Sequence, residues 1–186
     1  MDDVAENSGR MLECFRDYLR LLARSQIPPQ VRSKLDASDL VQLTLLRAYQ
    51  GLAQFRGRST AEKAAWLRQI LANTLANAVR DLTRERRDVG LERSLEASLN
   101  ESSSRLEGWL AAGQASPSQL AARNEQLLRL ASALDRLPED QREALLLKHM
   151  QGLSVAEIGE RLGRSRAAVA SLLRRGLREL RQVVRP

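Results

Sequence analysis

The sequence predicts an all-α protein of two small helical domains joined by a flexible linker. Apolar residues recur three and four positions apart along most of the chain, the period of an amphipathic helix and not of a strand. The 186 residues include only 10 Gly and 5 Pro, so few positions interrupt a helix. Apolar residues make up 43% and aromatic residues 3%, so we expect cores built mainly of Leu, Ala, Val and Ile.

The first domain is expected over residues 10–88, after a polar and disordered segment at residues 1–9. Its first helix is predicted over Gly9–Ser25 and ends before the Pro28-Pro29 pair, since proline breaks a helix. A second helix begins near Ser38 and turns one apolar face toward a core.

A turn at Phe55–Thr60 separates the second helix from a long third one. Ser59 or Thr60 is placed to cap this helix, which is predicted over Ala61–Arg87. Asn73 and Asn77 follow one another on one face of it, four residues apart.

Residues 89–117 are predicted to be a linker, because serine is frequent there and Pro117 closes the stretch. One short helix is expected inside it, over Leu106–Ala112. The second domain is expected over residues 118–183, with helices to about Arg136 and over Glu139–Gln151.

The end of the chain predicts a helix-turn-helix. Ser154 and Glu157 form a capping box at the start of a helix over Val155–Leu162. Gly163 is suited to the left-handed residue that ends a helix, and Ser165 can cap the next one.

The second helix of this motif is expected to bind DNA. Val169, Leu173, Leu177 and Leu180 form a narrow core stripe. From position 161 onward there are eight arginines and one acid, a local charge equal to the +7 of the whole chain. The candidate contacts to duplex DNA are Arg164, Ser165, Arg166, Ala167, Ala170, Ser171, Arg174, Arg175 and Arg178.

The first domain offers a second candidate DNA-binding surface. Amide and arginine side chains share one face of its long helix, beside a Gly/Ser loop and aromatic residues, a combination suited to unpaired bases. The candidate residues are Phe55, Arg56, Arg58, Ser59, Thr60, Trp66, Asn73, Asn77, Arg80 and Arg84.

The helix that begins near Ser38 carries apolar residues partly off its core face. Leu43 and Leu46 stand there, close to the acidic residues Asp36 and Asp39. This pattern indicates either a partner-binding surface or marginal packing in a small domain.

Enzymatic activity, a metal and a cofactor are not expected. Cys14 is the single cysteine, which excludes an internal disulfide and fits a reducing cytoplasm, and its apolar surroundings predict a core position. His149 is the single histidine and has no neighbouring ligand residues, so we expect a structural role. We expect neither a signal peptide nor a membrane-spanning segment from this sequence.

The ordered motifs resemble those of the extracytoplasmic-function sigma factors, the two-domain branch of the sigma-70 superfamily. The resemblance covers nearly the whole chain. It rests on Asp39–Tyr49, on Phe55–Ser59 with Trp66 and Asn73, on Leu134–Ala144, and on Gly152–Leu180. The serine-rich linker with Trp109 is similar to that of a planctomycete-type branch.

The resemblance implies an alternative sigma factor that directs core RNA polymerase to promoter DNA. The first domain would be region 2-like and read the minus-ten element as a melted strand. The second would be region 4-like and read the minus-thirty-five element as duplex. The residues that the resemblance assigns to polymerase binding are Asp36, Asp39, Leu40, Gln42, Leu43, Leu46 and Arg47.

Regulation is expected to come from a separate protein. An anti-sigma factor is the common solution of the family. Leu43 stands where the family usually has an acid, so phosphorylation of Thr44 or Thr60 by a Ser/Thr kinase is an alternative that would restore negative charge.

Two other classes of protein fit parts of the pattern. A dimeric helix-turn-helix activator or repressor would bind duplex DNA without polymerase and would need a dimerisation surface. An enzyme such as a recombinase would need a nucleophile in a catalytic cluster, which the serine-rich linker and His149 do not provide.

Overall fold

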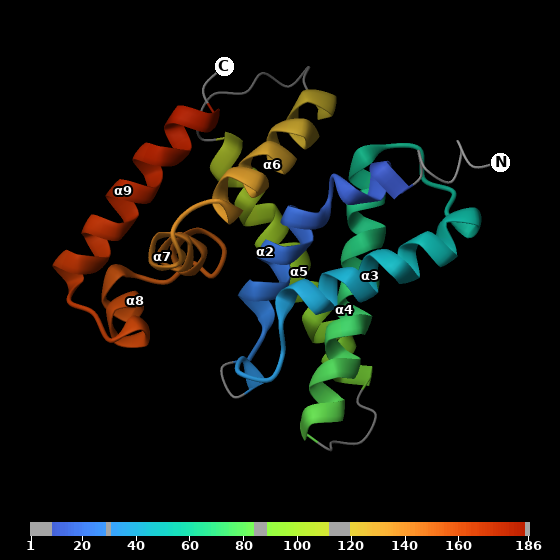
Figure 1. Ribbon diagram of the computed structural model, residues 1–186, viewed down its shortest axis with the longest axis horizontal. Coiled ribbons are helices and arrows are strands. Elements are labelled where there is room, and N and C mark those ends of the chain that lie inside the picture. The colour runs from blue at the N-terminus through green and yellow to red at the C-terminus, as the bar shows by residue number, and fades with distance from the viewer. Residues whose placement is uncertain (1–8, 29–30, 84–88, 112–119, 185–186) are drawn as a thin grey trace. The chain divides into compact units, whose positions relative to one another are not determined.

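The computed structural model describes residues 9–28, 31–83, 89–111 and 120–184, and every regular element in those ranges is a helix (Figure 1). The chain divides into two compact units, residues 1–101 and 102–186. The predicted all-α class with two helical domains is confirmed. The predicted disorder of residues 1–9 falls outside the described residues except at Gly9.

The first unit contains a short helix at residues 9–13 and then larger elements. These are α2 (Arg16–Gln26), α3 (Ala37–Gly51), the 3-10 helix η2 (Leu52–Gln54) and α4 (Thr60–Thr83). The core between them holds large buried side chains, namely Phe15, Tyr18, Leu19, Leu67, Leu71 and Leu75.

The helix expected over Gly9–Ser25 is interrupted by a turn at Cys14 and Phe15. The turn leaves Phe15 buried but Cys14 exposed, with its thiol donating to the Met11 carbonyl at 2.9 Å. The prediction that Cys14 is a core residue was therefore wrong, because it assumed one continuous helical register.

Helix α4 begins at a capping box. The Glu62 amide donates to Ser59 Oγ at 3.1 Å, and a Glu62 carboxylate oxygen accepts the Ser59 amide at 2.8 Å. Ser59, and not Thr60, is thus the cap. The same carboxylate accepts the Arg58 amide at 2.9 Å, and these backbone hydrogen bonds lower the pKa of Glu62.

The linker predicted at residues 89–117 is largely helical. Helix α5 runs over Val89–Ala111, and residues 112–117 lie outside the described ranges. Leu95, Leu99 and Leu106 are buried, and so are Ser102 and Ser103, while Ser94, Glu101 and Ser104 are exposed. The prediction of a flexible linker is therefore wrong over residues 89–111. The spacing of those leucines forms the buried face of a helix.

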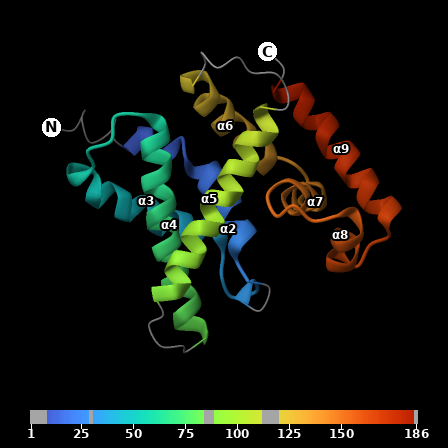
Figure 2. The ribbon, with the colours of Figure 1, turned by 180° about the vertical axis from the view of Figure 1, so that it is seen from behind.

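The two halves of α5 pack in different units. In the first unit, α5 lies beside α4 (Figure 2). There Arg68 of α4 donates to Asn100 at 2.7 Å and to the hydroxyl of buried Tyr18 at 2.9 Å. In the second unit, Trp109 stacks on His149, with ring centroids 4.0 Å apart and planes 5° from parallel. Both halves are therefore parts of folded units.

The second unit continues with α6 (Leu120–Asp135), α7 (Glu139–His149), α8 (Val155–Leu162) and α9 (Arg166–Val184). Buried Arg142 fixes the turn between α6 and α7, donating to the carbonyls of Asp135 at 2.9 Å and Leu137 at 3.2 Å. These bonds satisfy carbonyls at the end of α6 that have no partner within the helix.

The predicted helix-turn-helix is present as α8 and α9 (Figure 1). Ser154 and Glu157 form the expected capping box. Gly163 has φ +62°, the left-handed conformation that favours glycine. Ser165 Oγ accepts the Ala168 amide at 3.2 Å, and Ile158, Val169 and Leu147 make the core beneath the motif.

Candidate nucleic-acid interface

The outward face of α9 carries a basic surface built on small residues. Among the predicted duplex contacts, Ser171 is half-buried, and the exposed side chains are Arg164, Ser165, Arg166, Ala167, Ala170, Arg174, Arg175 and Arg178. The opposite side is buried at Val169, Leu172 and Leu180, with Leu173 and Leu177 half-exposed. The core side of α9 therefore contains the four predicted residues and, in addition, buried Leu172.

Two of these residues also serve the fold. The Ser165 hydroxyl caps α9, so its oxygen is already engaged by a backbone amide. Arg164 donates to the Asp140 carboxylate at 2.6 Å and so joins the turn of the motif to α7. Other exposed arginines of α9, among them Arg166, Arg174 and Arg178, are more available for DNA.

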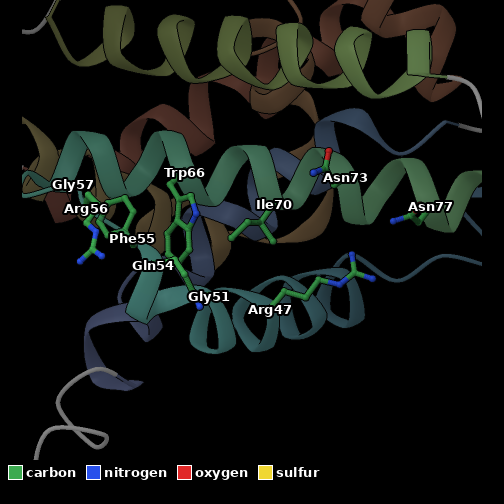
Figure 3. A pocket seen from close by; sticks show the side chains of 10 residues that line it. All are labelled: Arg47, Gly51, Gln54, Phe55, Arg56, Gly57, Trp66, Ile70, Asn73 and Asn77. Atoms are coloured by element: carbon green, nitrogen blue, oxygen red, sulfur yellow. The ribbon is translucent and has the colours of Figure 1, made fainter.

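A cavity of about 720 Å³ opens in the first unit between α3, the loop after η2, and α4 (Figure 3). Phe55 and Trp66 stack in its wall with ring centroids 4.6 Å apart and planes at 24°. Such rings supply an apolar face against which an unpaired base can stack. The predicted residues that line it are Phe55, Arg56, Trp66, Asn73 and Asn77.

Gly57 allows the loop to hold Phe55 in this wall. A Cβ atom at position 57 would lie 2.2 Å from Phe55 Cζ and 3.0 Å from Glu62 Cβ. Any larger residue would therefore displace the ring or the start of α4.

Arg58, Ser59, Thr60 and Arg80, also predicted for the melted strand, do not line the cavity. Arg58, Ser59 and Thr60 are exposed at the start of α4. Arg80 donates to Asn77 Oδ1 and pairs with Glu92 at 3.2 Å. Arg84 lies outside the described residues.

The sequence prediction missed half of the cavity lining, namely Arg47, Gly51, Gln54, Gly57 and Ile70. Ile70 lies four residues after Trp66 and three before Asn73 on α4, so helical spacing could have found it. Arg47, Gly51 and Gln54 come from α3 and η2. Their approach to α4 required the tertiary structure.

Helix α3 also presents an exposed surface away from the cavity. Leu43 is 40% exposed and Leu46 54% exposed, together with exposed Asp36, Asp39 and Gln42. Tyr49, which the sequence prediction missed, is 46% exposed on the same helix. A smaller cavity of about 260 Å³ is lined by Gln42, Leu46 and Tyr49, among others.

Two predictions on α3 need correction. Leu40 is only 4% exposed, so it packs in the core and cannot contact polymerase in this conformation. Thr44 is fully buried, and its hydroxyl donates to the Leu40 carbonyl at 2.7 Å, so a kinase cannot reach it without unfolding. Thr60 is exposed.

Within the described ranges, no cluster of three or more His, Cys, Asp or Glu side chains could hold a metal ion. His149 is half-buried and stacked on Trp109, and burial and the nearby Lys148 lower its pKa. The helices described are also too short or too polar to cross a membrane.

A basic recognition helix in one unit and an aromatic and amide cavity in the other define a helical DNA-binding protein with a helix-turn-helix. Two family models match in chain order: sigma-70 region 2 over residues 11–85, and sigma-70 region 4 over residues 127–180. Each match covers one of the two surfaces.

The chain is similar to curated sigma factors. It is 36% identical to the ECF RNA polymerase sigma factor SigG of Mycobacterium tuberculosis, over 81% of this chain but only 42% of that protein's length. It is 34% identical to the RNA polymerase sigma factor YlaC of Bacillus subtilis, over 78% of this chain and 76% of YlaC. The ECF RNA polymerase sigma factor EcfG of Rhodopseudomonas palustris is 33% identical, over 74% and 71% respectively.

The chain therefore belongs to the extracytoplasmic-function sigma factors of the sigma-70 family.

Proposed function

We propose that the protein is an alternative sigma factor that directs core RNA polymerase to specific promoters. The observation that carries the proposal is the pairing of two different DNA-binding surfaces, each in its own unit and each within a matched sigma-70 region. One suits duplex DNA and the other suits unpaired bases.

The exposed arginine face of α9 would read the minus-thirty-five element from the major groove. An arginine fork can donate two hydrogen bonds to one guanine, and the small residues Ala167 and Ala170 let the helix approach the bases. Arginines at the edge of the face would bind phosphates.

The cavity between α3 and α4 would hold a base of the melted minus-ten element. Withdrawing a base from the duplex costs a few kcal/mol. Stacking on the Phe55–Trp66 pair and hydrogen bonds to Asn73 and Asn77 would offset this cost. The protein itself would break no covalent bond in this process.

Core polymerase would bind the exposed side of α3, through Asp36, Asp39, Gln42, Leu43 and Leu46. Exposed apolar side chains in a helix rimmed by acids are typical of a protein–protein contact. Because polymerase works in the cytoplasm, that would also be the location of this protein.

A separate regulator would act on this surface or near it. An anti-sigma factor that covers α3 would block polymerase directly. Phosphorylation of exposed Thr60 would place a dianion at the start of α4, three residues after Gly57 of the cavity wall, where it would repel the DNA backbone.

Run-off transcription with purified core polymerase, with and without this chain, tests the proposal. We expect specific transcripts only when both are present. A dimeric activator or repressor would instead bind its duplex site alone, so specific binding of free duplex together with unchanged transcription start sites would contradict the proposal.

A further inference from the structure

An ion pair connects the turn of the helix-turn-helix to a helix outside the motif. Arg164 lies between α8 and α9, two residues before α9 begins. Its guanidinium donates to the carboxylate of Asp140 at 2.6 Å. Asp140 belongs to the first turn of α7 and stands 24 residues earlier in the chain. The sequence pattern of the motif alone therefore gave no sign of this pair.

The backbone of the turn is fixed, whereas the Arg164 side chain can move. The Arg164 amide donates to the Gly159 carbonyl at 2.9 Å. A Cβ atom at position 159 would lie only 2.7 Å from the Arg164 carbonyl oxygen, so the turn packs directly on α8. The side chains of Arg164 and Asp140 are by contrast 46% and 55% exposed. A pair so open to water adds little to stability, so its main effect is on the charge that the surface presents.

The position of Arg164 is one where an arginine would ordinarily bind DNA. The first residues of a recognition helix enter the major groove, so the turn before it lies close to the phosphates at the edge of the groove. A carboxylate and a phosphate bind a guanidinium through the same N–H donors, and Asp140 therefore competes with DNA for Arg164. No second carboxylate of the described residues pairs with Arg164. As it stands, the pair carries no net charge.

We propose that Asp140 is a positioning residue that withholds Arg164 from phosphates and so lowers the affinity of the chain for duplex DNA of any sequence. This inference rests on the proposed duplex binding by α9. The eight arginines from position 161 onward overstate the charge offered to DNA, because Asp140 lies outside that stretch and cancels one of them. Unrelated sites greatly outnumber promoters, so one phosphate contact fewer reduces the fraction of the protein held on unrelated DNA.

The test measures binding of the full chain to a short duplex of random sequence, by fluorescence anisotropy, between about 50 and 200 mM salt. Asp140→Asn removes the carboxylate charge and conserves the size of the side chain. We expect it to bind about three- to tenfold more tightly at the lowest salt. The slope of log affinity against log salt should steepen by about 0.9, the change for one added phosphate contact.

Glu160→Gln is the matched control for net charge. Glu160 is exposed on α8, four residues before Arg164, and its carboxylate has no partner among the described residues. This variant changes the net charge as Asp140→Asn does but releases no arginine, so its slope should stay near that of the wild type. In an Arg164→Gln background, Asp140→Asn should likewise leave the slope unchanged, because no guanidinium is there to be released.

Two further variants at position 140 guard against a change in folding. Asp140→Glu keeps a carboxylate within reach of Arg164 and should retain the wild-type slope. Asp140→Ser has the same expected effect as Asp140→Asn and places another residue favoured near a helix start in the first turn of α7. Thermal unfolding of each variant identifies any that is poorly folded.

The inference is overturned if well-folded Asp140→Asn and Asp140→Ser chains bind no more tightly than the wild type. It is also overturned if Glu160→Gln steepens the slope equally, or if the effect of Asp140→Asn persists without Arg164. A pair that only ties the turn to α7 predicts weaker binding or an unchanged slope. Run-off transcription by the wild-type chain with core polymerase is scored separately, so a failure of the proposed sigma function is distinguishable from a failure of this inference.

Discussion

In the proposed function, single side chains decide which bases each surface reads. On α9, Arg166, Arg174 and Arg178 are exposed, but an arginine can bind either a base edge or a phosphate. The two roles differ in consequence. A base contact carries sequence information, whereas a phosphate contact changes affinity for every sequence alike.

Arg174 lies at the middle of the exposed face, where we expect a base contact. Arg174→Ala should weaken promoter use by about 1–3 kcal/mol and relax the preference at one upstream position, because a bidentate contact to a single base is lost. The measurement is transcription from a set of promoters with each upstream base substituted in turn. Equal weakening on every promoter in the set would instead make Arg174 a phosphate contact.

Sequence patterns predicted residues that act locally better than they predicted contacts between helices. The capping residues Ser59 and Ser154 and the glycine Gly163 were predictable because they act within a few residues of the chain. That Arg47 lines the cavity beside α4 was not predictable, because a helical pattern shows which residues share a face and not which other helix that face meets. Leu40 is buried, as its place on the apolar face of α3 indicates.

At the scale of elements, α5 is the main departure from the sequence prediction. Its serines and acids resemble a linker in composition, but Leu95, Leu99 and Leu106 follow a helical spacing and become buried. Composition does not show which side of a helix is buried, and on α5 the small residues Ser102 and Ser103 are buried together with the leucines. The serine-rich stretch is therefore a structural part of both units.

The contact of α5 with α7 makes the second unit sensitive to acid. The pKa of His149 lies below its ordinary value of about 6.5 because burial penalises the imidazolium, and Lys148 adds to this. The unfolded chain then binds more protons than the folded one. The stabilising contribution of neutral His149 is thus complete above its unfolded pKa and is lost as pH falls through the folded pKa.

We expect the unfolding temperature of the protein to fall when pH is lowered from about 7.5 to about 5.5. His149→Phe keeps a ring against Trp109 without a titrating group, so its unfolding temperature should fall less. No other histidine is present in the sequence to confuse the comparison. Equal acid sensitivity of both proteins, measured by thermal unfolding, would contradict this role of His149.

At the scale of the whole molecule, the order of the motifs was more informative than any one of them. A basic helix-turn-helix or an amide-bearing helix alone fits several classes of protein. Together, in this order, they predicted the family that the matches to regions 2 and 4 establish. The sequence itself shows that the positive charge is concentrated near residue 186. The cavity in which Phe55 stacks on Trp66 is visible only in the structure.

In the proposed function, one unit binds duplex DNA and the other holds the opened strand. Permanganate reactivity of unpaired thymines, compared with promoter occupancy in polymerase complexes, tests this division most directly. We predict that Arg174→Ala lowers occupancy but leaves the opened fraction of bound complexes unchanged. Trp66→Ala should leave promoter occupancy unchanged and lower the opened fraction of bound complexes. Unaltered binding of Trp66→Ala to core polymerase is the control. Normal opening by Trp66→Ala, or an opening defect in Arg174→Ala at full occupancy, would contradict the account.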